Sequence, residues 1–102
     1  MTELEQRIVA VLVALGEGEV VSYGDVAHDA GFPGRARAVG SLLAGTDLDL
    51  PWWRVVRSDG RLATHKSSGQ AALLRAEGVT VRNGRVVDAP IGRFSRWPGR
   101  AP

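Results

Sequence analysis

The sequence contains no cysteine, and this absence removes several kinds of chemistry. Disulfides, thiolate zinc sites and thiol nucleophiles are excluded within these 102 residues. The two histidines, His28 and His65, are far apart along the chain, which argues against a metal site. No pair of carboxylates suited to acid–base catalysis is evident. The sequence therefore predicts a protein that is not an enzyme and needs no cofactor.

Long apolar runs are absent as well. No stretch approaches the roughly 18 apolar residues that a membrane-spanning helix needs, and we expect no targeting segment at the start. A hydrophobic share of 44% in 102 residues is ordinary for one soluble domain with a modest core. We expect a cytoplasmic protein without a membrane partner.

Acidic residues become scarce after the first third of the chain. Residues 1–31 hold six acids against one arginine, a net charge of −5, whereas residues 32–102 hold twelve bases against five acids, a net charge of +7. Twelve of the thirteen bases are arginine, whose planar guanidinium suits phosphates and base edges. This favours a polyanionic partner, although a coding bias toward arginine would give the same enrichment.

Two helices are predicted in the first 31 residues. The opening TELEQRIVAVLVALGEG has apolar residues at helical spacing and a capping-box pattern at Thr2 and Glu5. Ser22 and Asp25 give the same N-terminal signal for a second helix, which Gly31 is expected to end.

A third helix is expected from about Gly34 to Ala44, directly after Pro33. A turn of about three residues would then separate the second and third helices, as in a helix-turn-helix. Its apolar face should pack inward through Ala36, Val39, Leu42 and Leu43. The opposite face carries Arg37, Gly40, Ser41 and Ala44. Small side chains let a helix backbone come close to another surface, although a solvated arginine on an ordinary helix would show the same pattern.

The second half of the chain predicts short strands and one helix. WRVVRS, residues 53–58, is typical of a strand, and residues 69–77 of a helix with Leu73 and Leu74 in the core. VTVRNGRVV predicts a hairpin, because Asn83-Gly84 between valines is a strong turn signal.

These elements predict a small, mostly helical α/β domain of winged helix-turn-helix type. We expect it to span residues 1–89, followed by an Arg/Pro/Gly-rich tail over residues 90–102 that frays and carries Trp97. A fold of this type does not by itself fix a function.

Four segments, in this order, resemble a known family. VVSYGDVA, GFPGRARAVG, PWWRVVRSDGRL and LLRAEGV are similar to the DNA-binding domain of the O6-alkylguanine-DNA alkyltransferases, over roughly residues 4–82. In that family, a cysteine that accepts the alkyl group and a histidine that helps activate it follow the proline. Here Trp52 and Trp53 follow Pro51. An indole is neither a thiolate nor a base, so the chain resembles the alkyltransferase-like branch, which binds alkylated DNA without repairing it.

The resemblance also implies roles in DNA binding. The helix-turn-helix enters the minor groove, with Gly40 and Ser41 on the contacting face. Arg37 matches the arginine that fills the gap in the base stack, and Tyr23 the tyrosine that crowds a phosphate and promotes rotation of the target nucleotide. The implied partner is double-stranded DNA containing O6-alkylguanine, bound by a monomer at the nucleoid and passed to nucleotide excision repair proteins.

The lesion pocket is implied around the two tryptophans. Trp52 is expected to line it and Trp53 to pack behind, with the two side chains on opposite faces of a strand. Residues 62–69 replace the family's guanine-binding loop but are about two residues shorter. Glu77 matches a buried glutamate that orders the family's site, and here it has no histidine to hold. The remaining pocket candidates are Arg54, His65, Lys66, Ser67 and Ser68.

Two other functions stay open on the sequence. A winged-helix transcription regulator would explain the helix-turn-helix and the arginines, but not the paired tryptophans or the small helix face. A protein-interaction module of the same fold would not bind DNA at all. Affinity that depends on the lesion, rather than on sequence, separates the three.

Overall fold

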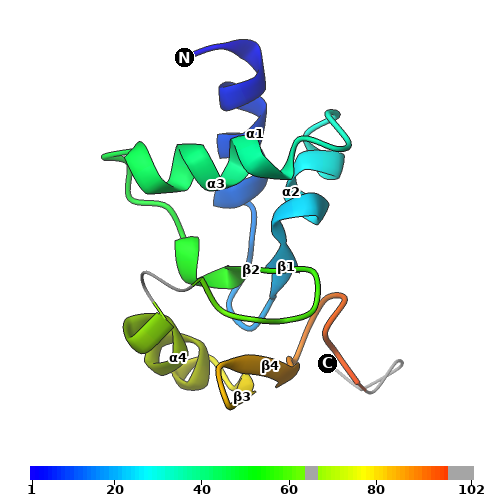
Figure 1. Ribbon diagram of the computed structural model, residues 1–102, viewed down its shortest axis with the longest axis vertical. Helices are drawn as coiled ribbons and strands as arrows, with labels where there is room; N and C mark the ends of the chain where they lie inside the picture. Colours follow the sequence, from blue (N-terminus) through cyan, green and yellow to red (C-terminus); the bar gives the residue numbers. More distant parts are fainter. Residues whose placement is uncertain (64–66, 97–102) are drawn as a thin grey trace.

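The computed structural model describes residues 1–63 and 67–96. The elements, in chain order, are α1 (Glu3–Val13), β1 (Val21–Ser22), α2 (Tyr23–Asp29), α3 (Ala36–Gly45), the 3₁₀ turn η1 (Trp52–Arg54), β2 (Val55–Val56), α4 (Ser67–Ala76), β3 (Thr80–Arg82) and β4 (Arg85–Asp88). Helices α1 to α3 occupy one end of the molecule, and α4 with the β3–β4 hairpin occupies the other (Figure 1). The mostly helical α/β fold predicted from the sequence is confirmed.

Both predicted capping boxes are present. The Glu5 amide donates to Thr2 Oγ1 at 3.1 Å, and the Thr2 amide donates to Glu5 Oε1 at 2.9 Å. Ser22 and Asp25 exchange the same two bonds at 2.9 and 3.0 Å at the start of α2. Each box satisfies two amides that have no partner within the helix, which is why α1 and α2 begin where they do.

Helix α2 ends at the predicted glycine. The Phe32 amide donates to the Ala27 carbonyl at 2.9 Å, and the Gly31 amide donates to the His28 carbonyl at 3.0 Å. This is a Schellman motif, which requires a left-handed residue, and Gly31 has a φ of 90°.

The connection between α2 and α3 is longer than predicted. It runs over residues 30–35, so the expected turn of about three residues and the helix start at Gly34 are both wrong. The Arg35 amide donates to the Phe32 carbonyl at 3.2 Å, closing a tight turn with Pro33 second and Gly34 third. Gly34 has a φ of 86°, which is incompatible with a right-handed helix, so α3 begins only at Ala36.

The short parallel pair β1–β2 lies between helices α1 to α3 and the end of the molecule formed by α4 and the hairpin (Figure 1), and it separates two hydrophobic clusters. Val21 and Val55 are register partners and pack with α1, α2 and α3, whereas Val56 packs with α4 and the hairpin. The first cluster comprises Ile8, Leu12, Leu15, Val21, Val26, Ala27, Ala30, Val39, Leu43, Leu50 and Val55. The second comprises Val20, Val56, Leu62, Leu74, Val79, Val81, Val86 and Ala89.

The predicted strand over residues 53–58 is only partly correct. Its first residues belong to η1, and the strand itself is limited to Val55–Val56. On α4, Leu74 is fully buried as predicted, but Leu73 is 40% exposed, so its assignment to the core is wrong. The inward face of α4 follows Gln70 and Leu74, which are one helical turn apart and completely buried, and Leu73 projects to the side of this face.

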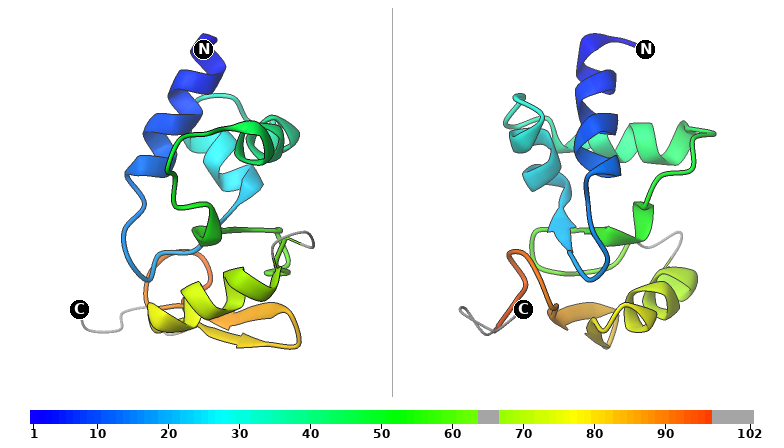
Figure 2. Two further views of the ribbon diagram at one scale, coloured as in Figure 1. Left: turned by 90° about the vertical axis from the view of Figure 1, so that its left-hand side faces the viewer. Right: turned by 180° about the vertical axis from the view of Figure 1, so that it is seen from behind.

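The predicted hairpin is confirmed. Asn83 and Gly84 have φ values of 52° and 72°, as a type I′ turn requires. Both views of Figure 2 place the hairpin next to α4, at the end of the molecule away from α3.

The chain does not fray at Pro90. The Ile91 amide donates to the Gly18 carbonyl at 3.2 Å, and Arg93 Nη1 donates to Ser22 Oγ at 3.2 Å and to Asp25 Oδ1 at 3.0 Å. The expectation of fraying is therefore wrong for residues 90–96, which fold back over the start of α2. Trp97 lies outside the described residues.

No helix among residues 1–63 and 67–96 combines the length and apolar character that crossing a membrane requires.

Gly60 provides a test of the turn that follows β2 and is hydrogen-bonded to the hairpin. It has a φ of 89°, and a Cβ there would lie 2.8 Å from the Val86 carbonyl oxygen. We expect Gly60→Ala to lower the free energy of unfolding by more than about 1 kcal/mol. Gly16→Ala is the matched control, because nothing lies within 4 Å of its Cβ. Equal urea midpoints for the two variants would contradict this account.

Candidate nucleic-acid interface

The outward face of α3 forms the floor of an open groove. Val39 is completely buried and Leu43 nearly so, while Ala36 and Leu42 are half-buried, so the predicted inward face is confirmed. The opposite face is exposed at Arg37 and Ser41. The groove has a volume of about 650 Å³ and is lined by Tyr23, Ala36, Arg37, Gly40, Ser41, Ala44 and Arg57.

Tyr23 is placed in the groove as the first residue of α2. Its ring is half-buried and packs against the first cluster. Burial raises the pKa of the phenol, and the charge of Arg57 opposes this only in part. The hydroxyl is therefore neutral at pH 7 and available as a hydrogen-bond donor.

Arg57 was missed by the sequence analysis. Strands β1 and β2 are parallel, and their last residues, Ser22 and Val56, are register partners. The next residues, Tyr23 and Arg57, therefore lie next to each other at the carboxyl end of the pair. Only this pairing brings the arginine to the groove, since the two residues are far apart in the sequence. The available signal was local: Arg57 directly follows the buried valines of the predicted strand.

The groove suits an anion. Arg37 and Arg57 supply two cations, and none of the lining residues is acidic. Gly40, Ser41 and Ala44 leave the helix surface low, so that a phosphate backbone or a base edge comes within reach of α3 itself.

The two tryptophans separate into the two hydrophobic clusters. Trp52 packs against the first cluster and Trp53 against the second. Their ring centroids are 6.1 Å apart with the planes at 90°, an edge-to-face contact. The explanation from strand alternation is wrong, because both residues belong to the 3₁₀ turn η1. Trp52 is half-buried rather than sealed inside the domain.

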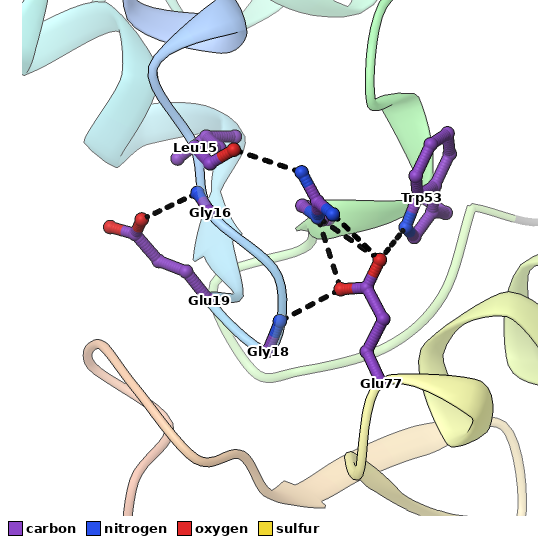
Figure 3. A network of polar contacts seen from close by, with 7 residues as sticks. Leu15, Gly16, Gly18, Glu19, Trp53 and Glu77 are labelled. Atoms are coloured by element: carbon purple, nitrogen blue, oxygen red, sulfur yellow. Dashed lines mark hydrogen bonds and ion pairs between the residues drawn. The ribbon is translucent and has the colours of Figure 1, made fainter. Parts of the chain in front are cut away.

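Glu77 is the centre of a polar network beneath η1 (Figure 3). Its carboxylate accepts hydrogen bonds from Trp53 Nε1 at 2.8 Å, from the Gly18 amide at 2.8 Å, and from Arg54 Nε and Nη2 at 3.0 and 2.8 Å. Arg54 Nη1 also donates to the Leu15 carbonyl at 2.8 Å. The network joins η1, the loop after α1 and the end of α4.

The position of Glu77 follows from the end of α4. The Val79 amide donates to the Leu74 carbonyl at 3.1 Å, and the Gly78 amide donates to the Arg75 carbonyl at 3.0 Å, a second Schellman motif. Glu77 thus stands at a helix C-terminus, where the helix dipole disfavours an anion. The donors around it compensate for this.

The protonation of Glu77 follows from its contacts. Its side chain is only 9% exposed, and burial by itself raises the pKa. Hydrogen bonds from Arg54, from the Gly18 amide and from Trp53 outweigh burial, so the pKa of Glu77 is lowered. The site therefore holds a carboxylate, and Arg54 lies 2.8 Å from it as an ion pair.

This network changes the roles assigned from the sequence. The sequence offers Glu77 no histidine to hold, and in the structure it holds an indole and a guanidinium instead. Arg54 was a candidate for the lesion pocket, yet its guanidinium is engaged by Glu77 and Leu15. We assign Arg54 and Trp53 to the support of the site.

Gln70 is a second residue that the sequence analysis missed. It is completely buried on α4, and its Nε2 donates to the Trp53 and Val55 carbonyls at 3.1 and 2.9 Å. Its Oε1 accepts from the Ala63 amide at 3.0 Å. The Gln70 side chain therefore ties α4 to η1, to the start of β2 and to the backbone at Ala63. The only signal was a polar residue one helical turn before the buried Leu74.

The remaining candidates lie elsewhere or are not described. His65 and Lys66 fall outside the described residues, and Ser67 and Ser68 are the first two residues of α4. His28 is exposed beside Asp29, with Nδ1 3.5 Å from the carboxylate. Within residues 1–63 and 67–96, no three His, Asp or Glu residues are grouped as metal ligands would be.

Comparison with known proteins identifies the family. Residues 3–79 match the DNA binding domain of 6-O-methylguanine DNA methyltransferase. The chain belongs to this family.

Relatives in the family include both binding proteins and enzymes. The DNA base-flipping protein of Escherichia coli is 39% identical over 96 residues, which cover 90% of this chain and 72% of that protein. The mouse methylated-DNA–protein-cysteine methyltransferase is 38% identical over 85 residues, covering 78% of this chain and 39% of the enzyme. The chain therefore shares a domain with proteins of both kinds.

A solved structure agrees with the fold and with the helix-turn-helix assignment. Atl1 of Schizosaccharomyces pombe, in complex with damaged DNA containing O6-carboxymethylguanine, has a TM-score of 0.73 and 27% identity. The alignment covers 80% of this chain and 82% of Atl1.

Glu77→Gln tests the network in this member of the family. A folded-state pKa below that of an unfolded glutamate means that the carboxylate stabilises the fold above about pH 4.3 and that this contribution is lost on further acidification. We expect Glu77→Gln to lower the free energy of unfolding by about 3 kcal/mol at pH 7.

Urea titrations of wild type and Glu77→Gln across pH measure this difference, which should close as the pH falls below about 4. Glu17→Gln, in the exposed part of the same loop, is the control and should have little effect. A difference that stays constant over the whole pH range would rule out the carboxylate as its source.

Proposed function

We propose that this protein binds duplex DNA at O6-alkylguanine and rotates the alkylated nucleotide out of the helix without chemical repair. The observation that carries the proposal is the α3 groove, where a surface of small residues is combined with Tyr23, Arg37 and Arg57 and with no acidic group. A base-flipping relative at 39% identity and the Atl1 complex with O6-carboxymethylguanine DNA support it.

We assign a task to five of the residues that line the groove. Gly40 and Ser41 let α3 lie close to the floor of the minor groove. Arg37 projects from that surface into the base stack and fills the gap left by the rotated nucleotide. Tyr23, with a neutral hydroxyl, crowds and hydrogen-bonds the phosphate of the target nucleotide, while Arg57 beside it neutralises phosphate charge.

The free energy of flipping is balanced by stacking and charge. Extruding a base costs a few kcal/mol, and less where alkylation has already weakened its pairing. Stacking on an aromatic ring returns roughly 1–3 kcal/mol per base, and the part of the half-buried Trp52 side chain that stays exposed is the surface assigned to this. Arg37 and the phosphate contacts supply the remainder. Damaged sites are preferred because they cost less to open.

Binding without transfer follows from the side chains at the site. The 102 residues contain no cysteine to accept an alkyl group. The indole nitrogen of Trp53 donates to Glu77 and has no lone pair available to act as a base. The protein therefore marks the lesion, acting as a monomer at the nucleoid, and we propose that nucleotide excision repair proteins remove it.

Titration of lesion-containing DNA tests binding. We expect tighter binding to a duplex with one O6-methylguanine than to the same duplex without it, measured by fluorescence anisotropy. Arg37→Ala should weaken lesion binding by at least about tenfold, or 1.4 kcal/mol, with the fold intact by circular dichroism. Arg7→Ala is the control, since Arg7 lies on α1 in an exposed ion pair with Glu3.

Equal affinity of the wild type for both duplexes would reject lesion recognition. Affinity that follows sequence instead would indicate a transcription regulator, and failure to bind DNA at low salt would indicate a protein-interaction module.

Incubation with O6-methylguanine DNA tests the absence of transfer. The modified base should be recovered in full after enzymatic digestion and chromatography, and the protein mass should not change. Appearance of guanine, or a protein heavier by one methyl group, would show that the chain is an enzyme after all.

A further inference from the structure

A second basic hollow lies on the hairpin, apart from the face of α3. It has a volume of about 720 Å³ and its lining includes four exposed arginines: Arg57, Arg61, Arg82 and Arg85. No acidic residue lines it. Neither the resemblance of the sequence nor the proposed lesion site accounts for this concentration of charge.

The backbone forces these arginines together. Arg82 and Arg85 are register partners across the hairpin, and Arg61 is bridged to Arg85 on the other side. The Leu62 amide donates to the Gly84 carbonyl at 3.0 Å, which holds the third segment in place. Like charges directly opposite each other destabilise a sheet. The free protein therefore carries an unfavourable arrangement that a bound anion would relieve.

The carboxylate of Asp59 offsets this positive charge only in part. Asp59 Oδ2 lies 3.4 Å from Arg61 Nε and 3.8 Å from Arg85 Nη2. Both arginine side chains remain about half exposed, at 60% and 46%, so each keeps donors directed to solvent. One carboxylate against four guanidinium groups leaves the hollow strongly positive.

Arg57 connects this hairpin hollow to the α3 groove, because Arg57 lines both. A single basic surface therefore runs from α3 along the turn after β2 to the tip of the hairpin. A phosphodiester backbone is an extended polyanion of regularly spaced charges, and it fits such a surface better than a single small anion does.

We propose that the hairpin hollow binds the phosphate backbone of the same DNA duplex, on the flank of the damaged site. This rests on the proposed function in one respect only, the identity of the DNA. The contact is independent of lesion and sequence, since guanidinium groups on phosphates read neither. It holds the protein on undamaged duplex and adds the same free energy to damaged and undamaged DNA.

The double variant Arg82→Gln/Arg85→Gln tests the contact. Each lost phosphate contact should reduce the salt dependence of log K by about 0.9, so from about 50 to about 200 mM salt the wild type should lose about 12-fold more affinity than the variant. The ratio of affinities for damaged and undamaged duplex should not change. Arg7→Gln, an exposed arginine of α1, is the control and should keep the wild-type salt dependence. The thermal midpoint of the double variant should be no lower than that of the wild type, since like-charge repulsion is relieved.

The outcomes separate the two proposals. A wild type that prefers the lesion while the double variant keeps the wild-type salt dependence would overturn the hairpin contact alone and point to another partner, such as an acidic protein. An unchanged salt dependence is decisive even if overall affinity falls. A wild type without lesion preference, whose salt dependence still drops in the double variant, would overturn the lesion-binding function and leave the hairpin contact standing.

Discussion

The carboxylate of Glu77 is the interaction on which the site depends. It collects donors from the loop after α1 through Gly18, and from η1 through Trp53 and Arg54, at the point where α4 ends. Because β1–β2 is a partition only two residues long on each strand, side-chain bonds across it from Glu77 and from the buried Gln70 help to fix the relative positions of the two hydrophobic clusters. The Glu77 carboxylate is almost fully enclosed and fully bonded, and it contributes to this only while ionised.

The same network shows how the fold accommodates tryptophan at position 53. A tryptophan at position 53 offers an N–H of the right reach to Glu77, so the support of the site is kept. Trp52 packs against the first hydrophobic cluster, and its side chain is only partly buried. Under the proposed function, this aromatic surface stands where the resemblance places the family's reactive group. In the proposed function, recognition rests on α3 and on the cost of opening the duplex, not on bond formation.

Features specified by neighbouring residues could be predicted from the sequence, and features made by tertiary pairing could not. The capping boxes at Thr2 and Ser22 and the Asn83-Gly84 hairpin are local, and they are found as expected. The inward face of α3 followed from its spacing. In contrast, the groove position of Arg57 depends on the parallel pairing of β1 with β2, and the buried role of Gln70 depends on where η1 lies. No single-sequence pattern distinguishes a strand from a 3₁₀ turn at Trp52–Arg54, because either conformation can lead directly into the buried valines Val55 and Val56.

The most direct measurement is a crystal structure of the protein bound to a duplex with one O6-methylguanine. We predict the modified base outside the helix with its ring against Trp52, and the Arg37 side chain in the vacated stack. A modified base that remains stacked and paired, with α3 lying in the major groove, would contradict this prediction.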